Sequence, residues 1–255
     1  MSLLDLAQAF FTAVEKTEQF PVTVLNYVWI NQKAAKPDKD GVLCHVPLHY
    51  LDNAFVNAKE NPRTDVIIWL DHKLLDPTSL FFVQSHAYYN APSNISFRDL
   101  NEIPRYKKWG AFNPNQNIWK RVDLARLLVM DHSFIQTDAE QVFYSDFDIT
   151  NIKIAAGFLQ KRLRHFGFIV GKTNSGVVEN SFFGFTREKG LATLRHNLLP
   201  MTRQSVRTAE NGYPAFRVWV KLSSITKNRK ICAVKVPCSG YVMPKPKLYK
   251  DYKIG

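Results

Sequence analysis

The 255-residue sequence lacks several features that mark particular classes of protein. It contains no uninterrupted apolar run of about 20 residues, so no segment is predicted to span a membrane. The N-terminus lacks the basic-then-apolar order of a secretory signal. Neither an internal repeat nor a low-complexity segment is present. We therefore expect a soluble or cytoplasmic protein whose mature chain begins at Met1.

Cysteine is also scarce. The three cysteines, Cys44, Cys232 and Cys238, do not have the spacing of zinc ligands. An odd number of cysteines in a chain without a secretory signal indicates reduced thiols. We predict no site from them.

What the sequence has in excess is positive charge. Lys and Arg number 34 against 22 Asp and Glu, which gives a net charge of +12. A basic face of this kind could contact a phosphate-bearing ligand, an anionic membrane surface or nucleic acid. The 45% hydrophobic and 13% aromatic content fits a globular protein with a sizeable core.

Alternating strand and helix patterns predict an α/β fold. The apolar runs 22–30 and 65–71 have the length of strands that are buried on both faces, and the helical pattern 47–59 joins them into a βαβ unit. Further helices are predicted at 2–19, 113–130, 150–166 and 186–199, and further strands at 95–100, 143–149, 168–170, 177–183, 215–222 and 231–236. We expect one domain over residues 1–243 with a β-rich C-terminal part, followed by a basic tail at 244–255.

Three details of this pattern can be compared directly with a structure. Thr150 is expected to cap the helix that ends at Phe166, and residues 131–141 are expected to form a polar connection. The helix at 47–59 is expected to bury Leu48, Leu51, Phe55 and Val56.

Two aspartates one residue apart interrupt the apolar run 143–149. Residues i and i+2 of an extended strand point to the same side, so Asp146 and Asp148 can aim at one point where the strand leaves the core. Two carboxylates this close repel each other unless a cation lies between them. Mn²⁺ or Mg²⁺ suits such oxygen ligands. An aspartate pair also occurs by chance at turns and strand ends, so the pair alone is weak evidence for a metal site.

Five short motifs, taken in their order along the chain, add to the evidence from the aspartate pair. In order they are Val28-Trp29-Ile30-Asn31, Asn61-Pro62, Asp123-Leu124-Ala125-Arg126, Tyr144-Ser145-Asp146-Phe147-Asp148 and Glu179-Asn180-Ser181. This order resembles the sugar-binding region of GT-A glycosyltransferases, and most of all the branch with the large clostridial glucosylating toxins and the yeast initiating mannosyltransferases. The resemblance implies a GT-A-like, Rossmann-type mixed sheet flanked by helices.

The same resemblance implies an activity. The enzyme would move a hexosyl group from a UDP- or GDP-linked sugar to a hydroxyl of a glycan or protein, with retention of the anomeric configuration and with Mn²⁺ or Mg²⁺ as cofactor. Trp29 would stack on the nucleotide base, beside Val28 and Asn31. Asp123 and Arg126 would bind the sugar hydroxyls of the donor.

The remaining motif residues also receive roles by resemblance. Tyr144 would lie near the ribose or base, and Asp146 would contact the ribose, the sugar and the metal. Asp148 would ligate the metal directly. Glu179 and Asn180 would border the sugar and the reacting carbon, and Asn180 with Asp146 would belong to the catalytic centre.

The sequence departs from the family in two places. Family members commonly carry a Gly-Gly pair just before the aspartate strand, whereas the connection after Arg126 is longer and free of glycine. The toxins close a late Ser-x-Trp over the phosphates, and Ser239-Gly240-Tyr241 is the corresponding candidate here.

Plainer interpretations of these residues remain open. Trp29 could be ordinary core packing, Asp123 and Arg126 a surface ion pair, and Asn180 the cap of a turn. Two other functions also remain open. One is a metal-dependent phosphodiesterase or nuclease, with Asp71 and Glu179 as the obvious additional ligands. The other is a basic protein that binds nucleic acid or a membrane surface without catalysis.

Overall fold

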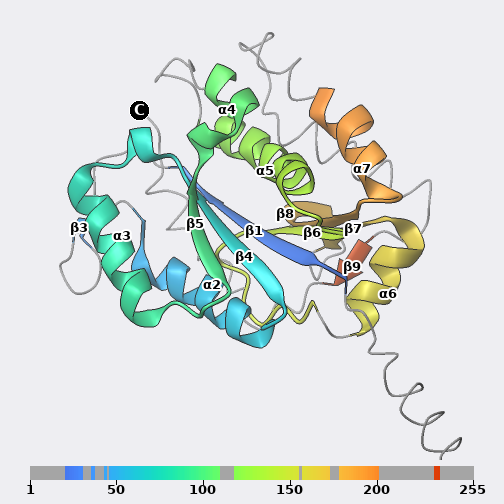
Figure 1. Cartoon of the computed structure of the whole chain (residues 1–255), viewed down its shortest axis with the longest axis horizontal. Helices are drawn as coiled ribbons and strands as arrows, with labels where there is room; N and C mark the ends of the chain where they lie inside the picture. The colour runs from blue at the N-terminus through green and yellow to red at the C-terminus, as the bar shows by residue number, and fades with distance from the viewer. Residues whose placement is uncertain are drawn as a thin grey trace, which may run out of the picture.

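The apolar runs predicted as buried strands lie side by side in one seven-stranded sheet of the computed structural model (Figure 1). The structure describes residues 21–30, 36–37, 43–44, 46–109, 118–154, 157–172, 178–200 and 233–235. The strands, in spatial order, are β5 (Ile95–Asp99), β4 (Thr64–Leu70), β1 (Thr23–Trp29), β6 (Gln141–Ser145), β8 (Val178–Thr186), β7 (Phe168–Lys172) and β9 (Ala233–Lys235). The first four run parallel, β8 is antiparallel to both β6 and β7, and β9 is parallel to β7. The sheet is therefore mixed, as predicted.

Helices cover both faces of this sheet (Figure 1). One face carries α4 (Pro104–Trp109), α5 (Ile118–Gln136) and α7 (Gly190–Ala192), and α7 continues into the π-helical turn η3 (Thr193–Leu198). The other face carries α2 (Leu48–Glu60), α3 (Pro77–Asn90) and α6 (Gly157–Phe166). The short turns η1 (His72–Leu74) and η2 (Leu100–Glu102) follow β4 and β5, and β2 (Lys36–Pro37) pairs with β3 (Leu43–Cys44) in a separate hairpin.

Alternate residues of each central strand enter two different cores. In β1, Val24 and Val28 pack with α4 and α5, whereas Leu25 and Tyr27 pack with α2, α3 and α6. A strand enclosed in this way needs apolar residues on both sides, which explains why the runs 22–30 and 65–71 do not alternate with polar residues.

One polar side chain lies in the middle of the first core. The Asn26 amide of β1 donates to the Phe143 carbonyl at 3.2 Å and to Met130 Sδ at 3.9 Å. Its Oδ1 accepts from Trp69 Nε1 at 2.8 Å and from the Ser133 hydroxyl at 3.1 Å. A single buried amide thus joins β1 to β4, β6 and α5.

Several predicted element boundaries are wrong. Helix α5 runs through 131–136, where we expected a polar connection, because Asp131 is buried there and pairs with Arg105 at 3.3 Å and Arg195 at 2.5 Å. In α2, Leu51 and Phe55 are buried as predicted, but Val56 is 41% exposed. The helix predicted from Thr150 begins only at Gly157.

Other predictions fall outside the described residues. These are the helix at 2–19, the strand at 215–222, most of the strand at 231–236, and the boundary between the domain and the tail at 243. Within the described ranges, no helix combines the length and the apolarity needed to cross a bilayer.

Candidate functional site

The order of the strands creates a switch point between β1 and β6. From β1 the chain crosses to β4 and β5 on one side, then returns to β6 on the other side of β1. Open α/β sheets bind ligands at the carboxyl ends of the strands that flank such a point. The antiparallel strand β8 passes the same edge, because Ser145 at the end of β6 is paired with Phe182 in the middle of β8.

A buried guanidinium occupies this edge. Arg126 of α5 pairs with Asp146, just after β6, at 2.7 Å, and with Asp123 of its own helix at 3.6 Å. It also donates to the Asn180 carbonyl at 3.3 Å. The side chains of Arg126 and Asp123 are only 9% and 3% exposed, so the interpretation of this pair as a surface ion pair is wrong.

Tyr144 completes the contacts of Asp146. Its hydroxyl donates to Asp146 Oδ1 at 2.5 Å, and its ring lies 5.1 Å below the Arg126 guanidinium. Burial raises the pKa of Tyr144 well above its ordinary value, so the hydroxyl keeps its proton and remains a donor. Burial also raises the pKa of Asp146, while the Arg126 charge and the Tyr144 hydrogen bond act in the opposite direction.

Asn180 reaches the same group from β8. Its amide donates to Asp123 Oδ1 at 2.9 Å, and the side chain is buried. The structure therefore brings together Asp123, Arg126, Tyr144, Asp146 and Asn180, and we call these five residues the β6 cluster. Their contacts join residues up to 57 positions apart, so only the fold can bring them to one place.

The two aspartates are not arranged as the sequence suggested. Strand β6 ends at Ser145, and residues 146–148 form a turn that is closed by the Ile149 amide donating to the Asp146 carbonyl at 3.3 Å. The alternation of side chains along a strand therefore does not decide where Asp146 and Asp148 point. The prediction that the chain leaves the core at this place is wrong, because Phe147, Ile149 and Ile152 are buried in the core that α2, α3 and α6 cover.

Trp29 lies at the carboxyl end of β1 and is half-buried. Its ring is 5.5 Å from Tyr50 of α2 and 6.1 Å from Phe147, between the two aspartates. The neighbouring Val28 side chain is buried in the core, so only its backbone can contribute to a ligand site. An aromatic group with part of its surface exposed at this edge can accept a planar heterocycle.

Three carboxylates lie in or next to the β6 cluster. Asp123 and Asp146 both pair with Arg126, and Asp148 lies two residues after Asp146. In the part of the chain that the structure describes, no three His, Cys, Asp or Glu side chains gather as a metal site.

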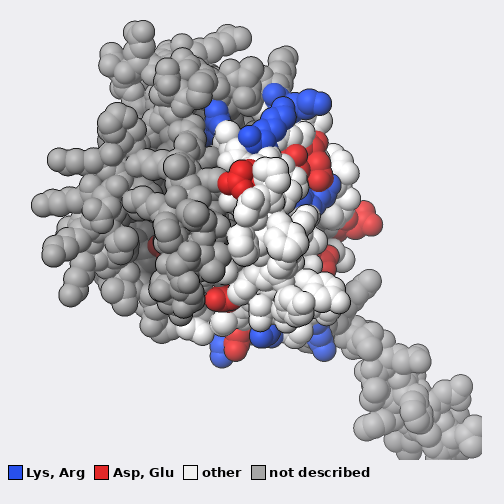
Figure 2. Space-filling model, turned by 90° about the vertical axis from the view of Figure 1, so that its left-hand side faces the viewer, with Lys and Arg blue, Asp and Glu red and all other residues white. Residues whose placement is uncertain are grey.

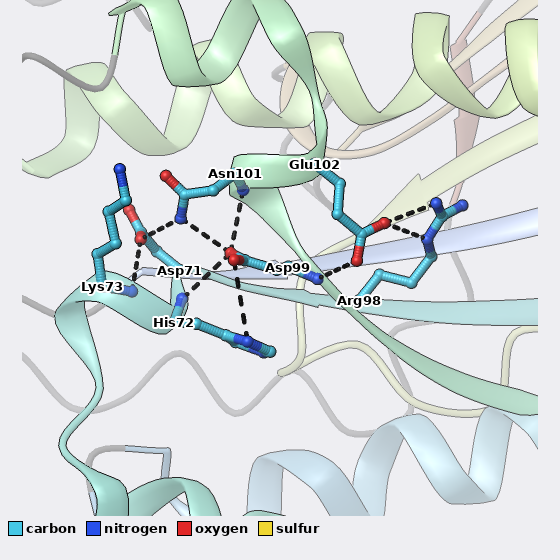
Figure 3. Close-up of polar contacts among 7 residues, drawn as sticks. All are labelled: Asp71, His72, Lys73, Arg98, Asp99, Asn101 and Glu102. Atoms are coloured by element: carbon cyan, nitrogen blue, oxygen red, sulfur yellow. Dashed lines mark hydrogen bonds and ion pairs between the residues drawn. The ribbon is translucent and has the colours of Figure 1, made fainter.

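A second polar cluster lies at the ends of β4 and β5 and consists of Asp71, His72, Lys73, Arg98, Asp99, Asn101 and Glu102 (Figure 3). Asp71 Oδ1 accepts from the Lys73 amide at 3.1 Å and from Asn101 Nδ2 at 2.9 Å. Its Oδ2 accepts from the Tyr106 hydroxyl at 2.6 Å. Asp99 caps the turn that follows β5.

This second group, the β4–β5 cluster, has the pattern of helix and turn capping rather than of a metal centre. Both oxygens of Asp71 already accept hydrogen bonds, so Asp71 is a poor candidate for the additional ligand that a two-metal phosphodiesterase would need. Burial, together with the nearby Asp71 charge, raises the pKa of Tyr106, which keeps its hydroxyl protonated and donating.

Three predicted donor residues cannot be placed. Asn31 and Ser239 lie outside the described residues, and Glu179 lies in β8 with its side chain outside them. Figure 2 views the side of the molecule that carries α3, where the described Lys and Arg side chains are interspersed with Asp and Glu around an uncharged area. The predicted contact of a basic face with an anionic surface therefore stays a prediction.

The sequence interpretation gave no role to several residues that surround the site. Tyr50 and Phe147 flank Trp29, and a row of asparagines, Asn53, Asn57 and Asn61, contacts the chain that follows Asp146. Asn61 and Phe147 stand in the quoted motifs without a role of their own. The four-residue spacing of the asparagines, along the predicted helix at 47–59 and just past its end, is the signal that could have revealed the row.

Comparisons with known proteins agree with the fold. No family model matches the sequence, and no curated protein matches it either. Among solved structures, the PaToxG glycosyltransferase is 15% identical, covers 88% of this chain and 78% of its own, and superposes with a TM-score of 0.52. A structure described only as a transferase is 12% identical, covers 84% of this chain and 90% of its own, and has a TM-score of 0.50. The predicted glycosyltransferase fold, a GT-A-like mixed sheet flanked by helices, is thereby confirmed.

Proposed function

We propose that this protein is a glycosyltransferase that moves a hexosyl group from a nucleoside-diphosphate sugar, linked to UDP or GDP, to a hydroxyl of a glycan or protein. The observation that carries the proposal is the β6 cluster: a buried arginine shared by two carboxylates, with Asn180 from a third element, at the switch point of a glycosyltransferase-like sheet. Sugars present rings of hydroxyls, and this cluster offers both donors and acceptors that are held in place.

Each residue of the site would then have a defined task. Arg126, Asp123 and Asn180 would bind and orient the hydroxyls of the donor sugar. The Asp146 side chain is 24% exposed, and its carboxylate would accept a hydrogen bond from the sugar or the ribose. Trp29 would hold the base. Transfer with retention needs no strong enzymic nucleophile, so none is assigned.

A divalent cation would be held by Asp148 together with Asp146. When bound, Mn²⁺ or Mg²⁺ acts as a Lewis acid that stabilises the negative charge on the departing diphosphate. The oxygen-only donors support such a hard cation.

The proposal is tested by thermal denaturation with Mn²⁺, UDP, GDP and their hexose conjugates, singly and in combination. Ligands that bind the folded state raise the melting temperature, and the proposal predicts a rise that needs both metal and nucleotide. Equal stabilisation by unrelated polyanions without metal would instead favour a basic binding protein.

Asp148→Ala is the sharpest single variant. We expect at least a 100-fold loss of donor hydrolysis or transfer, because removing a group that stabilises transition-state charge costs on the order of 10²–10³ in rate. The melting temperature without ligand should change little, because Asp148 is half-buried at a turn. Normal activity in this variant would exclude the metal assignment.

A further inference from the structure

The asparagine row, defined as Asn53, Asn57 and Asn61, contacts the backbone after the first aspartate at five points. Asn53 Nδ2 donates to the Phe147 carbonyl at 2.8 Å, and Asn57 Nδ2 donates to the Ile149 carbonyl at 2.7 Å. Asn61 Nδ2 donates to the Ile152 carbonyl. The side-chain oxygens also accept: Asn57 Oδ1 from the Ile152 amide at 3.0 Å, and Asn61 Oδ1 from the Ile154 amide at 2.7 Å.

The geometry of a helix explains why this spacing works. Four residues of an α-helix rise about 6 Å, which brings Asn53, Asn57 and Asn61 to one face at regular intervals. The carbonyl of Phe147 in the turn and that of Ile149 just after it meet the successive asparagines Asn53 and Asn57. The chain from 146 to 154 runs alongside α2 in the same direction and uses the asparagine amides in place of a neighbouring strand.

These contacts provide hydrogen-bond partners for the backbone amides and carbonyls of an irregular segment. Residues 149–154 belong to neither a helix nor a strand, yet Ile149, Ile152 and Ile154 are buried, so their backbone groups need partners inside the protein. The asparagine row supplies them. It also explains why the predicted helix at 150–166 begins only at Gly157, because the asparagines bind the Ile149 and Ile152 carbonyls and the Ile152 and Ile154 amides, which a helix would use for its own hydrogen bonds.

We propose that the asparagine row positions Asp148, and hence the cation, through the backbone. The inference rests on the function proposed above. The Phe147 carbonyl that Asn53 binds lies between Asp146 and Asp148, so this hydrogen bond fixes the peptide that joins the two carboxylates. Phe147 is held from its other side as well, with its ring 4.9 Å from Tyr27, whose hydroxyl accepts from Asn57 Nδ2 at 2.8 Å. Asn53 is thus a positioning residue that touches no reacting atom.

Asn53→Ala tests this role in the full-length protein. Titration with Mn²⁺ in the presence of UDP, followed by the electron paramagnetic resonance signal of free Mn²⁺, should give an affinity about tenfold weaker than wild type, the low end for losing an outer-shell partner. Because Asn53 is half-buried and makes a single such bond, the melting temperature without ligand should stay close to that of wild type. Hydrogen exchange in peptides covering 147–154 should accelerate.

The matched control is Asp52→Asn, one residue away on the same helix. Asp52 pairs with His86 of α3 at 2.7 Å and is exposed, so the change weakens a contact between helices without touching 147–154. Mn²⁺ affinity and loop exchange should match wild type. Unchanged Mn²⁺ affinity together with unchanged exchange in Asn53→Ala would overturn the positioning role. Should wild-type protein bind no Mn²⁺ with any nucleotide, the proposed function fails, and the exchange measurement alone decides whether the row orders the segment.

Discussion

The β6 cluster and the β4–β5 cluster lie at the same edge of one sheet, yet their carboxylates are held in opposite ways. In the β4–β5 cluster, Asp71 and Asp99 accept from amides two residues further along the chain, at 3.1 and 3.0 Å (Figure 3). In the β6 cluster, Asp146 is bound by Arg126, 20 positions away, and Asp123 by Asn180, 57 positions away. Asp71 also accepts from Asn101 and Tyr106, which are 30 and 35 positions away, so the difference lies in the kind of partner. The partners of Asp71 are neutral amides and a hydroxyl, whereas the β6 cluster holds a buried guanidinium, and convergence of buried charged groups is the pattern of a binding site.

The largest expected difference between the clusters concerns their arginines. Arg126→Ala leaves Asp123 and Asp146 without their shared buried partner, which should cost about 3–5 kcal/mol of unfolding free energy. Arg98→Ala removes a partly exposed pair with Glu102, and its cost should stay below about 1 kcal/mol. Urea denaturation of both variants measures the difference. Equal costs would mean that the two clusters are not energetically distinct.

Asp71→Ala should affect stability but not ligand binding. The change leaves the buried Tyr106 hydroxyl without its acceptor and removes one of the two acceptors of the Asn101 amide, which should cost about 1–3 kcal/mol in urea denaturation. The nucleotide affinity of the folded variant should equal that of wild type in calorimetric titration. A variant of full stability that no longer binds nucleotide would place Asp71 in the site and revive the phosphodiesterase hypothesis.

Trp29→Ala should weaken donor binding more than turnover. Stacking of a base on an aromatic side chain is worth about 1–3 kcal/mol, so nucleotide affinity should fall roughly tenfold or more while kcat changes less. Trp69→Phe is the matched control, because Trp69 is fully buried in β4 and donates to Asn26 at 2.8 Å. The Trp69→Phe variant should have a lower free energy of unfolding and the same nucleotide affinity as wild type. A Trp29 variant with normal affinity would support ordinary core packing.

The smallest expected effect is a pH dependence beside the β4–β5 cluster. Burial, then the Arg98 charge, lowers the pKa of His132, while Glu102 and Asp131 act in the opposite direction. The unfolded chain therefore binds the proton more readily, so the stability associated with His132 is present above pH 6.5 and is lost as the pH falls toward its lowered folded-state pKa.

His132→Phe should remove that dependence. The phenyl ring keeps an aromatic contact with Trp69, whose ring lies 5.6 Å from that of His132. The change also removes the buried Nε2, which has no hydrogen-bond partner among the described residues. Melting temperatures from pH 7.5 down to 5.5 should therefore fall less steeply in the variant than in wild type. Parallel curves would show that His132 does not titrate differently in the two states.

Sequence reasoning predicted those features that local pattern determines. The predominantly apolar runs of β1 and β4 predict strands covered on both faces, and both were placed within two residues of their observed ends. The convergence of Asp123, Arg126, Asp146 and Asn180 was implied by motif order alone, and the structure brings them within hydrogen-bonding or ion-pairing distance of one another.

Features decided by distant partners could not be predicted in the same way. The polar residues at the end of α5 suggested a loop, because nothing local reveals that Arg105 and Arg195 neutralise Asp131. Likewise, the helical pattern after Thr150 is overridden by Asn57 and Asn61, which lie more than 90 positions earlier. In both places tertiary hydrogen bonds outweigh a local propensity of a few tenths of a kcal/mol per residue.

The Asn26 amide has a consequence for how firmly Asp123 and Arg126 are held in place. Apolar packing alone would allow a long buried helix to shift along the sheet, since one apolar contact can replace another. Asn26 forms hydrogen bonds with Ser133 and Met130 of α5. A shift of the helix by one turn, about 5.4 Å, would therefore leave several buried polar atoms without hydrogen-bond partners. The helix that carries Asp123 and Arg126 is thus fixed along the sheet, so we expect any movement on ligand binding to lie in elements other than α5.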